Sequence, residues 1–158
     1  MNEYASFSDV DYKWFFDDPK VSQNDLTQIR PLSKEYAAML WTEYISSKHQ
    51  HLAMHFVKGD APWIDSLERL DYDWEDAWNA NDVNGLGLLL NSRFEISDDE
   101  PILFFWDNAS GVETTWGIFL RNWINFLYED EAPVLFIRSK NIAVIFRPMG
   151  TILASEKT

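Results

Sequence analysis

The C-terminal half of the chain contains short, wholly apolar stretches of the length of β-strands. The first is residues 102–106, and residues 116–127 follow with Trp116, Leu120 and Trp123 at helical spacing behind Thr115, a capping residue type. Three further strands are expected, at residues 134–137, 142–146 and 151–154. Their connections have hairpin length, so this half predicts the order β-α-β-β-β with an antiparallel meander.

The N-terminal half predicts mainly helices and one early strand. That strand is expected over residues 12–16, where Asp17, Asp18 and Pro19 end it. Helices are expected over 23–29 behind Ser22, over 34–47 behind Ser33, in a broken form over 63–78 with Asp73 as a cap, and over 83–92 behind Asp82. The sequence therefore predicts an α+β fold with helices on one face of the meander.

Length and cysteine content limit the kind of protein. A chain of 158 residues fits one domain, spanning 1–158. The absence of cysteine excludes disulfides, thiolate nucleophiles and cysteine-ligated zinc. The first residues lack the basic start and apolar run of a secretory signal, and no apolar run approaches membrane-spanning length. We therefore expect a cytoplasmic protein that does not enter a membrane.

Charge restricts the possible partners. The formal net charge is -13, and residues 60–100 hold twelve acidic and two basic side chains, so this segment carries most of the excess. Such a chain repels nucleic acid phosphates and anionic lipid surfaces. Any partner that charge attracts is therefore expected to be a basic protein, and nucleic acid is not expected.

Acidic and aromatic residues alternate in the centre of this segment. Asp71, Asp73, Trp74, Asp76 and Trp78 together predict a carboxylate-rimmed aromatic patch that holds a basic peptide through charge and cation–π contact. The alternative is that the two indoles are core residues at helical spacing. The first hypothesis for function is therefore a small protein-binding module for a basic partner, with an immunity-like or regulatory role.

An enzyme with an unrecognised carboxylate or histidine site is the second hypothesis. The sequence contains no phosphate-binding loop and no nucleophile elbow, so no catalytic residue can be assigned. Asp71, Asp73 and Glu75 alternate as calcium-loop ligands do. Asp76 and Asp82, however, stand where that loop requires glycine and glutamate.

All three histidines lie close together, at His49, His51 and His55. On a helix, His51 and His55 would be one turn apart, and His49 could join them at a divalent metal ion. The segment lacks the glutamate of the metalloprotease helix, so a catalytic zinc is not expected. A metal-binding regulator is the third hypothesis, a solvated segment is the alternative reading, and no other cofactor is expected.

Four stretches resemble a known group of proteins. They are DLTQIRP at 25–31, LWTEYIS at 40–46, KGD at 58–60 and TTWG at 114–117. In combination the chain is similar to a family of uncharacterised gammaproteobacterial proteins of comparable length, a domain of unknown function. The resemblance implies a bacterial, cytoplasmic setting and supplies no catalytic residues.

The metal hypothesis makes a direct prediction. Excess zinc or nickel should raise the melting temperature, because a ligand that binds only the folded state stabilises it. Calorimetry on the wild type and on His51→Ala checks this, since the substitution should remove the shift. A melting temperature that ignores both metals would end the hypothesis.

Overall fold

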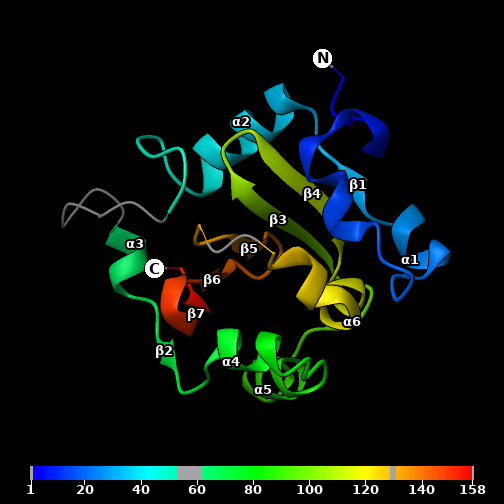
Figure 1. The fold of residues 1–158 in the computed structure, drawn as a ribbon. Coiled ribbons are helices and arrows are strands. Elements are labelled where there is room, and N and C mark those ends of the chain that lie inside the picture. The colour runs from blue at the N-terminus through cyan, green and yellow to red at the C-terminus, as the bar shows by residue number, and fades with distance from the viewer. Residues whose placement is uncertain (1, 53–61, 129–130, 158) are drawn as a thin grey trace.

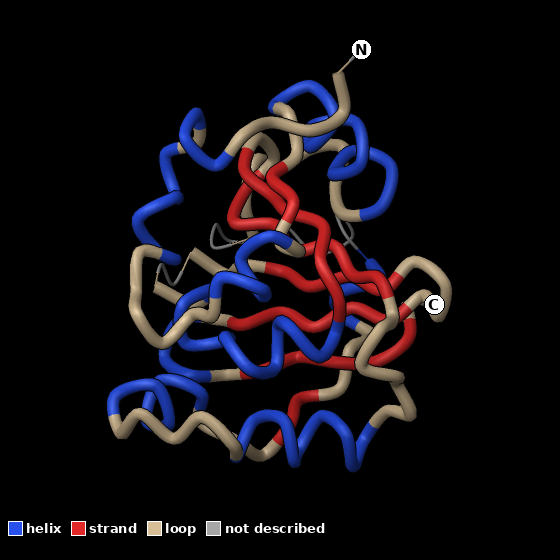
Figure 2. The backbone as a smooth tube through the Cα atoms, turned by 90° about the vertical axis from the view of Figure 1, so that its right-hand side faces the viewer, coloured by secondary structure: helices blue, strands red, loops and turns tan. Residues whose placement is uncertain are grey.

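One antiparallel sheet forms the centre of the protein (Figures 1 and 2). The computed structural model describes residues 2–52, 62–128 and 131–157. In these residues seven strands follow the order β1-β4-β3-β5-β6-β7-β2. They are β1 Arg30–Pro31, β2 Arg69–Leu70, β3 Pro101–Asp107, β4 Ser110–Thr115, β5 Val134–Ile137, β6 Ile142–Phe146 and β7 Ile152–Glu156. The predicted α+β class and the C-terminal meander β5-β6-β7 are confirmed.

Strand β3 is buried on both faces and separates two cores. Phe104 and Trp106 belong to the core beneath α6, Trp116–Phe126, whereas Leu103 and Phe105 belong to the core on the opposite face. The first core also includes side chains of α4, Trp74–Asn79, and α5, Gly85–Arg93. The second core includes those of α2, Lys34–Tyr44, and α3, Pro62–Asp65.

The expectation that helices cover one face of the meander is therefore wrong. Tyr44 of α2 packs against Phe136 of β5, with ring centroids 5.2 Å apart, whereas the neighbouring Leu135 belongs to the core beneath α6. A strand whose consecutive residues are all apolar exposes apolar surface on both faces of its sheet, and each face must be covered. The unbroken run at 102–106 required helices on both sides.

The strand expected over residues 12–16 is also wrong, because these residues form a 3₁₀ helix, η2 Asp11–Phe16. A strand would bury alternate side chains, but Trp14 is 55% exposed while Tyr12, Phe15 and Phe16 are buried. The buried rings pack on Trp106, and the Tyr12 ring centroid lies 4.4 Å from that of Trp106. The strands of the N-terminal half are β1 and β2, and neither includes residues 12–16.

The sequence did not predict strands β1, β2 and β4. Strand β4 reads SGVETT and contains one large apolar residue, so periodicity does not reveal it. It forms because β3 supplies a full ladder of partners from Pro101↔Thr115 onward. The edge strands β1 and β2 are two residues long, and short edges of this kind limit pairing with other chains.

Helix starts were predicted more accurately than strands. Ser22 caps α1, Gln23–Thr27, and Ser33, Asp73 and Thr115 cap the helices that follow them, each side chain accepting a backbone N–H. Helix α5 differs, because it begins at Gly85 with Asn84 as its N-cap residue. Asp82 still accepts the Gly85 N–H, at 3.3 Å. Two short 3₁₀ segments complete the chain, η1 Phe7–Asp9 and η3 Pro148–Gly150.

Trp123 tests the packing of α6 on the sheet. Its side chain is fully buried and its Nε1–H donates to the Val83 carbonyl over 2.9 Å. Trp123→Ala should therefore lower the free energy of unfolding by about 3–5 kcal/mol in a denaturant titration. Trp14→Ala is the matched control, because an exposed tryptophan should cost less than about 1 kcal/mol. Equal losses in the two variants would contradict this packing.

Candidate functional site

Helix α4 displays the predicted acidic segment. Asp73 begins the helix by accepting the Asp76 N–H at 3.0 Å, and Glu75 and Asp76 occupy the first turn. Carboxylates are favourable there because backbone N–H groups and the helix dipole give this end a partial positive charge. Asp71, Asp73 and Asp76 are all exposed, as the partner hypothesis requires.

The two tryptophans of α4 differ in their positions. Trp74 is only 2% exposed, and its Nε1–H donates to the Arg147 carbonyl at 2.9 Å. This indole anchors α4 to the turn between β6 and β7 and belongs to the core. Trp78 is half-buried, and its Nε1–H donates to the Ile124 carbonyl of α6 at 2.8 Å. Of the two predicted indoles, Trp78 is the one that reaches the surface.

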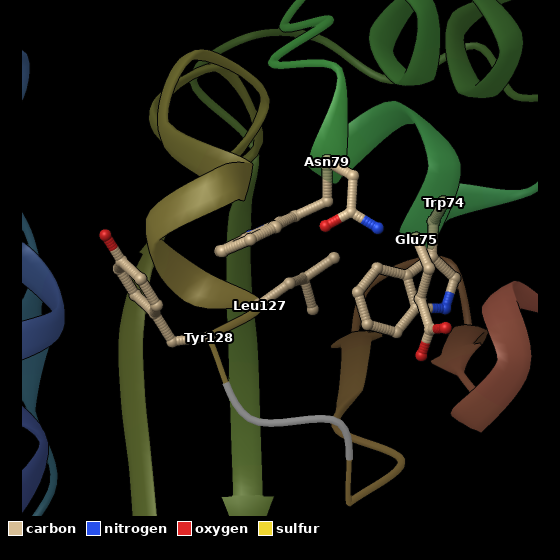
Figure 3. A pocket seen from close by; sticks show the side chains of 6 residues that line it. Trp74, Glu75, Asn79, Leu127 and Tyr128 are labelled. Atoms are coloured by element: carbon tan, nitrogen blue, oxygen red, sulfur yellow. The ribbon is translucent and has the colours of Figure 1, made fainter.

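A pocket of about 320 Å³ lies between α4 and the end of α6 (Figure 3). Trp78 and Tyr128 meet at one side of it, with ring centroids 5.5 Å apart and planes at 78°. Tyr128 is 40% exposed, and its ring centroid lies 5.4 Å from that of the exposed Trp14. The residues that line the pocket are Trp74, Glu75, Trp78, Asn79, Leu127 and Tyr128.

One carboxylate lines this pocket, and further acidic residues lie nearby along the chain. Glu75 lines it, and no lysine or arginine is present among the described residues that do so. Asp71, Asp73 and Asp76 lie on the same short helix or directly before it. The pocket and these three exposed carboxylates are called the α4 surface below. The aromatic side of the pocket and the Glu75 carboxylate suit a cationic side chain.

A second hollow of about 320 Å³ adjoins the start of α4. It lies between the segment 69–73 and the residues 149–151 that connect β6 to β7. Gly150 adopts φ +84°, and a Cβ at this position would overlap the Asp73 carboxylate. Glycine is therefore required here both by the backbone conformation and by the close approach of Asp73.

A larger hollow, a groove of about 850 Å³, lies beside α5 and α6. Asp25 lies at its side, where Arg121 Nε and Nη2 donate to the two carboxylate oxygens at 3.2 and 2.8 Å. Asn122 donates to the same carboxylate at 3.0 Å. The hydrogen bonds from Arg121 hold the pKa of Asp25 below its ordinary 3.8. This carboxylate is ionised at neutral pH, ties α1 to α6 and is unsuited to proton transfer near neutral pH.

The histidines are only partly described. The His49 carbonyl accepts the Trp41 indole N–H at 2.7 Å, and the His49 backbone N–H donates to Ser46 Oγ at 3.0 Å. His55 lies outside the described residues, so the predicted trio is not tested and stays a prediction. Within the described part of the chain, no group of three or more His, Asp or Glu side chains is arranged to hold a metal ion.

Comparison with known proteins gives a family. The chain belongs to the DUF2947 family, described as "Protein of unknown function", whose model matches residues 4–154. No curated protein and no solved structure matches the chain. Among the described residues, none of the helices has the length and apolar character needed to cross a membrane.

Sequence reasoning missed the far side of the pocket. Tyr128 and Asn79 were not predicted, and Trp14 was assigned to a strand. Tyr128 directly follows the predicted helix 116–127, and no pattern along the chain brings it to Trp78. Their contact depends on how α4 and α6 pack, and the Trp78 indole bond to Ile124 fixes that packing.

The Asp25 ion pair predicts a pH dependence. Because the pKa is lower in the folded state, the pair stabilises the fold above about pH 4, and this stabilisation is lost as pH falls through the folded-state pKa. Asp25→Asn should reduce the free energy of unfolding by about 1–3 kcal/mol at neutral pH, and the difference should shrink in acid. Denaturant titrations across pH measure it, with Asp9→Asn as the control at an exposed aspartate of η1. A difference that stays constant with pH would contradict the assignment.

Proposed function

We propose that this chain is a protein-binding module of the bacterial cytoplasm that docks a basic partner on the α4 surface. One observation carries the proposal. The pocket has the Trp78 and Tyr128 rings on one side and the Glu75 carboxylate in its lining, and three exposed aspartates lie on or directly before the same helix. Aromatic rings and carboxylates combined in one hollow are the groups that recognise lysine and arginine side chains.

The volume of the pocket supports a side chain as its occupant. A hollow of about 320 Å³ is at the small end of the range for drug-sized ligands and admits one long side chain. A cation over the exposed part of the Trp78 or Tyr128 ring would gain roughly 0.5–2 kcal/mol, depending on how far it is desolvated. The carboxylate of Glu75 would add attraction to the same cation.

The charge of the whole chain supports a basic partner over other macromolecules. A net charge of -13 concentrated in one segment accelerates encounter with positive surfaces and slows encounter with phosphate backbones. The exposed carboxylates of Asp71 and Asp76 contribute little to folding stability, because solvated charges interact weakly. Covering a basic partner surface in this way fits an immunity-like or regulatory role.

The groove beside α5 favours one alternative function. It is larger than the pocket and brings Lys20, Asn84 and Arg121 to one hollow, as a small-molecule enzyme site would. A substitution in the groove distinguishes the two functions. Lys20→Ala in the groove would reduce an enzymatic activity, whereas a binding module would keep its affinity for the basic partner.

Partner capture tests the proposed function. The protein is immobilised and exposed to native bacterial extract at low and at moderate salt, and association of the recovered partner is then timed. Asp71→Asn/Asp76→Asn should slow association roughly two- to tenfold at low salt, because steering charge is removed. Asp73 stays unchanged because it caps α4 and contacts Gly150.

Glu35→Gln/Glu43→Gln is the matched control, since it removes the same charge from exposed positions on α2. Tyr128→Ala should in addition speed dissociation, because it removes one side of the pocket. Association rates that respond equally to the two double variants would point to net charge alone. A partner that ignores both doubles and Tyr128→Ala would place the interface elsewhere.

A further inference from the structure

The connection between β6 and β7 presents one apolar side chain to solvent. Met149 is 87% exposed, the highest value among the exposed large apolar residues of the described chain. Its backbone has φ +67° and ψ 20°, the left-handed region. A bulky side chain seldom adopts this conformation, because its Cβ crowds the neighbouring carbonyl.

Contacts with α4 hold Met149 in this conformation. Glu75 Oε1 accepts the Met149 N–H at 3.2 Å. Trp74 donates its indole N–H to the Arg147 carbonyl, and Gly150 packs against Asp73. Three consecutive residues of the acidic segment therefore fix the turn. Backbone strain persists only where surrounding contacts determine it in this way, and such strain is concentrated at ligand contacts.

The fold gains nothing evident from a methionine here. The side chain lies outside both cores, and asparagine or glycine would satisfy φ +67° with less strain. The location of Met149 between two hollows suits a role in binding. Met149 lines the hollow at the start of α4, and Glu75, which accepts its N–H, lines the aromatic pocket. Met149 thus stands at the border between the two hollows.

We propose that Met149 is an apolar contact of the α4 surface, and that the partner segment carries an apolar side chain for Met149 beside the basic side chain for the Trp78–Tyr128 pocket. This inference rests on the proposed function and makes the partner a mixed basic and apolar peptide segment. Methionine suits the contact because its unbranched, polarisable side chain adapts to different apolar shapes. The surrounding carboxylates select the basic component.

The test uses two synthetic peptides with fluorescein labels, equal in length and in number of arginines. One contains leucines between the arginines, and the other contains serines at the same positions. Fluorescence anisotropy should show that the leucine peptide binds the wild type at least about fivefold more tightly. Met149→Asn should remove this advantage, and Met149→Leu should retain it. Met39→Asn, at an exposed methionine of α2, should leave it unchanged.

Stability separates binding from a structural role. Because asparagine tolerates the left-handed region, Met149→Asn should keep or raise the melting temperature, by up to about 4 °C, while it weakens binding of the leucine peptide. A merely structural methionine would lose stability and affinity together, which would overturn the inference.

The peptide pair also separates the two proposals. If both peptides bind the wild type equally, or if Met149→Asn keeps the leucine advantage, Met149 is no partner contact and the basic-partner function stands. If neither peptide binds at low salt, the proposed function fails and the inference falls with it.

Discussion

The rest of the structure depends on the burial of β3 between two cores. Its consecutive apolar side chains point alternately to opposite faces, so neither face can meet solvent. On one face Trp106 stacks on Phe126, with ring planes at 11°, and donates its indole N–H to the Phe126 carbonyl at 2.8 Å. This fixes the end of α6, and Tyr128, two residues further on, is thereby placed beside α4. The candidate pocket follows from how the central strand is covered.

Tryptophan side chains connect the irregular segments to this centre. The indoles of Trp41, Trp74, Trp78, Trp106 and Trp123 each donate to a backbone carbonyl of another segment, so each large ring fills space and orients a turn or helix end. Short helices such as α4 are not stable alone in water. Packing and hydrogen bonds from these indoles provide the stability that helix propensity does not. The aromatic richness of the sequence therefore has a structural role first. Among the described residues, the exposed aromatic surface at α4 comes from Trp14, Tyr128 and part of Trp78.

The α4 surface combines rigid and strained elements with solvated charge. The Trp74 indole bonds α4 to the Arg147 carbonyl, and Asp73 caps the helix. Glu75 holds Met149 in its unfavourable conformation. The exposed carboxylates of Asp71 and Asp76 interact weakly with the fold, so their charge can act in an encounter with a basic surface. In the groove, by contrast, Asp25 is fully engaged by Arg121 and Asn122, so charge there stabilises the fold itself.

The sequence by itself determined the α+β class, the C-terminal meander and the positions of most helix caps, because apolar period and capping chemistry are local properties. It also located the acidic helix with its exposed aspartates. Only the tertiary structure decided that residues 12–16 form a 3₁₀ helix, because Trp106 supplies the surface on which their rings pack. It likewise decided that SGVETT is a strand, that Trp74 is core, and that Tyr128 and Met149 flank α4. These features depend on contacts between residues far apart in the sequence, and a local sequence pattern does not specify such contacts.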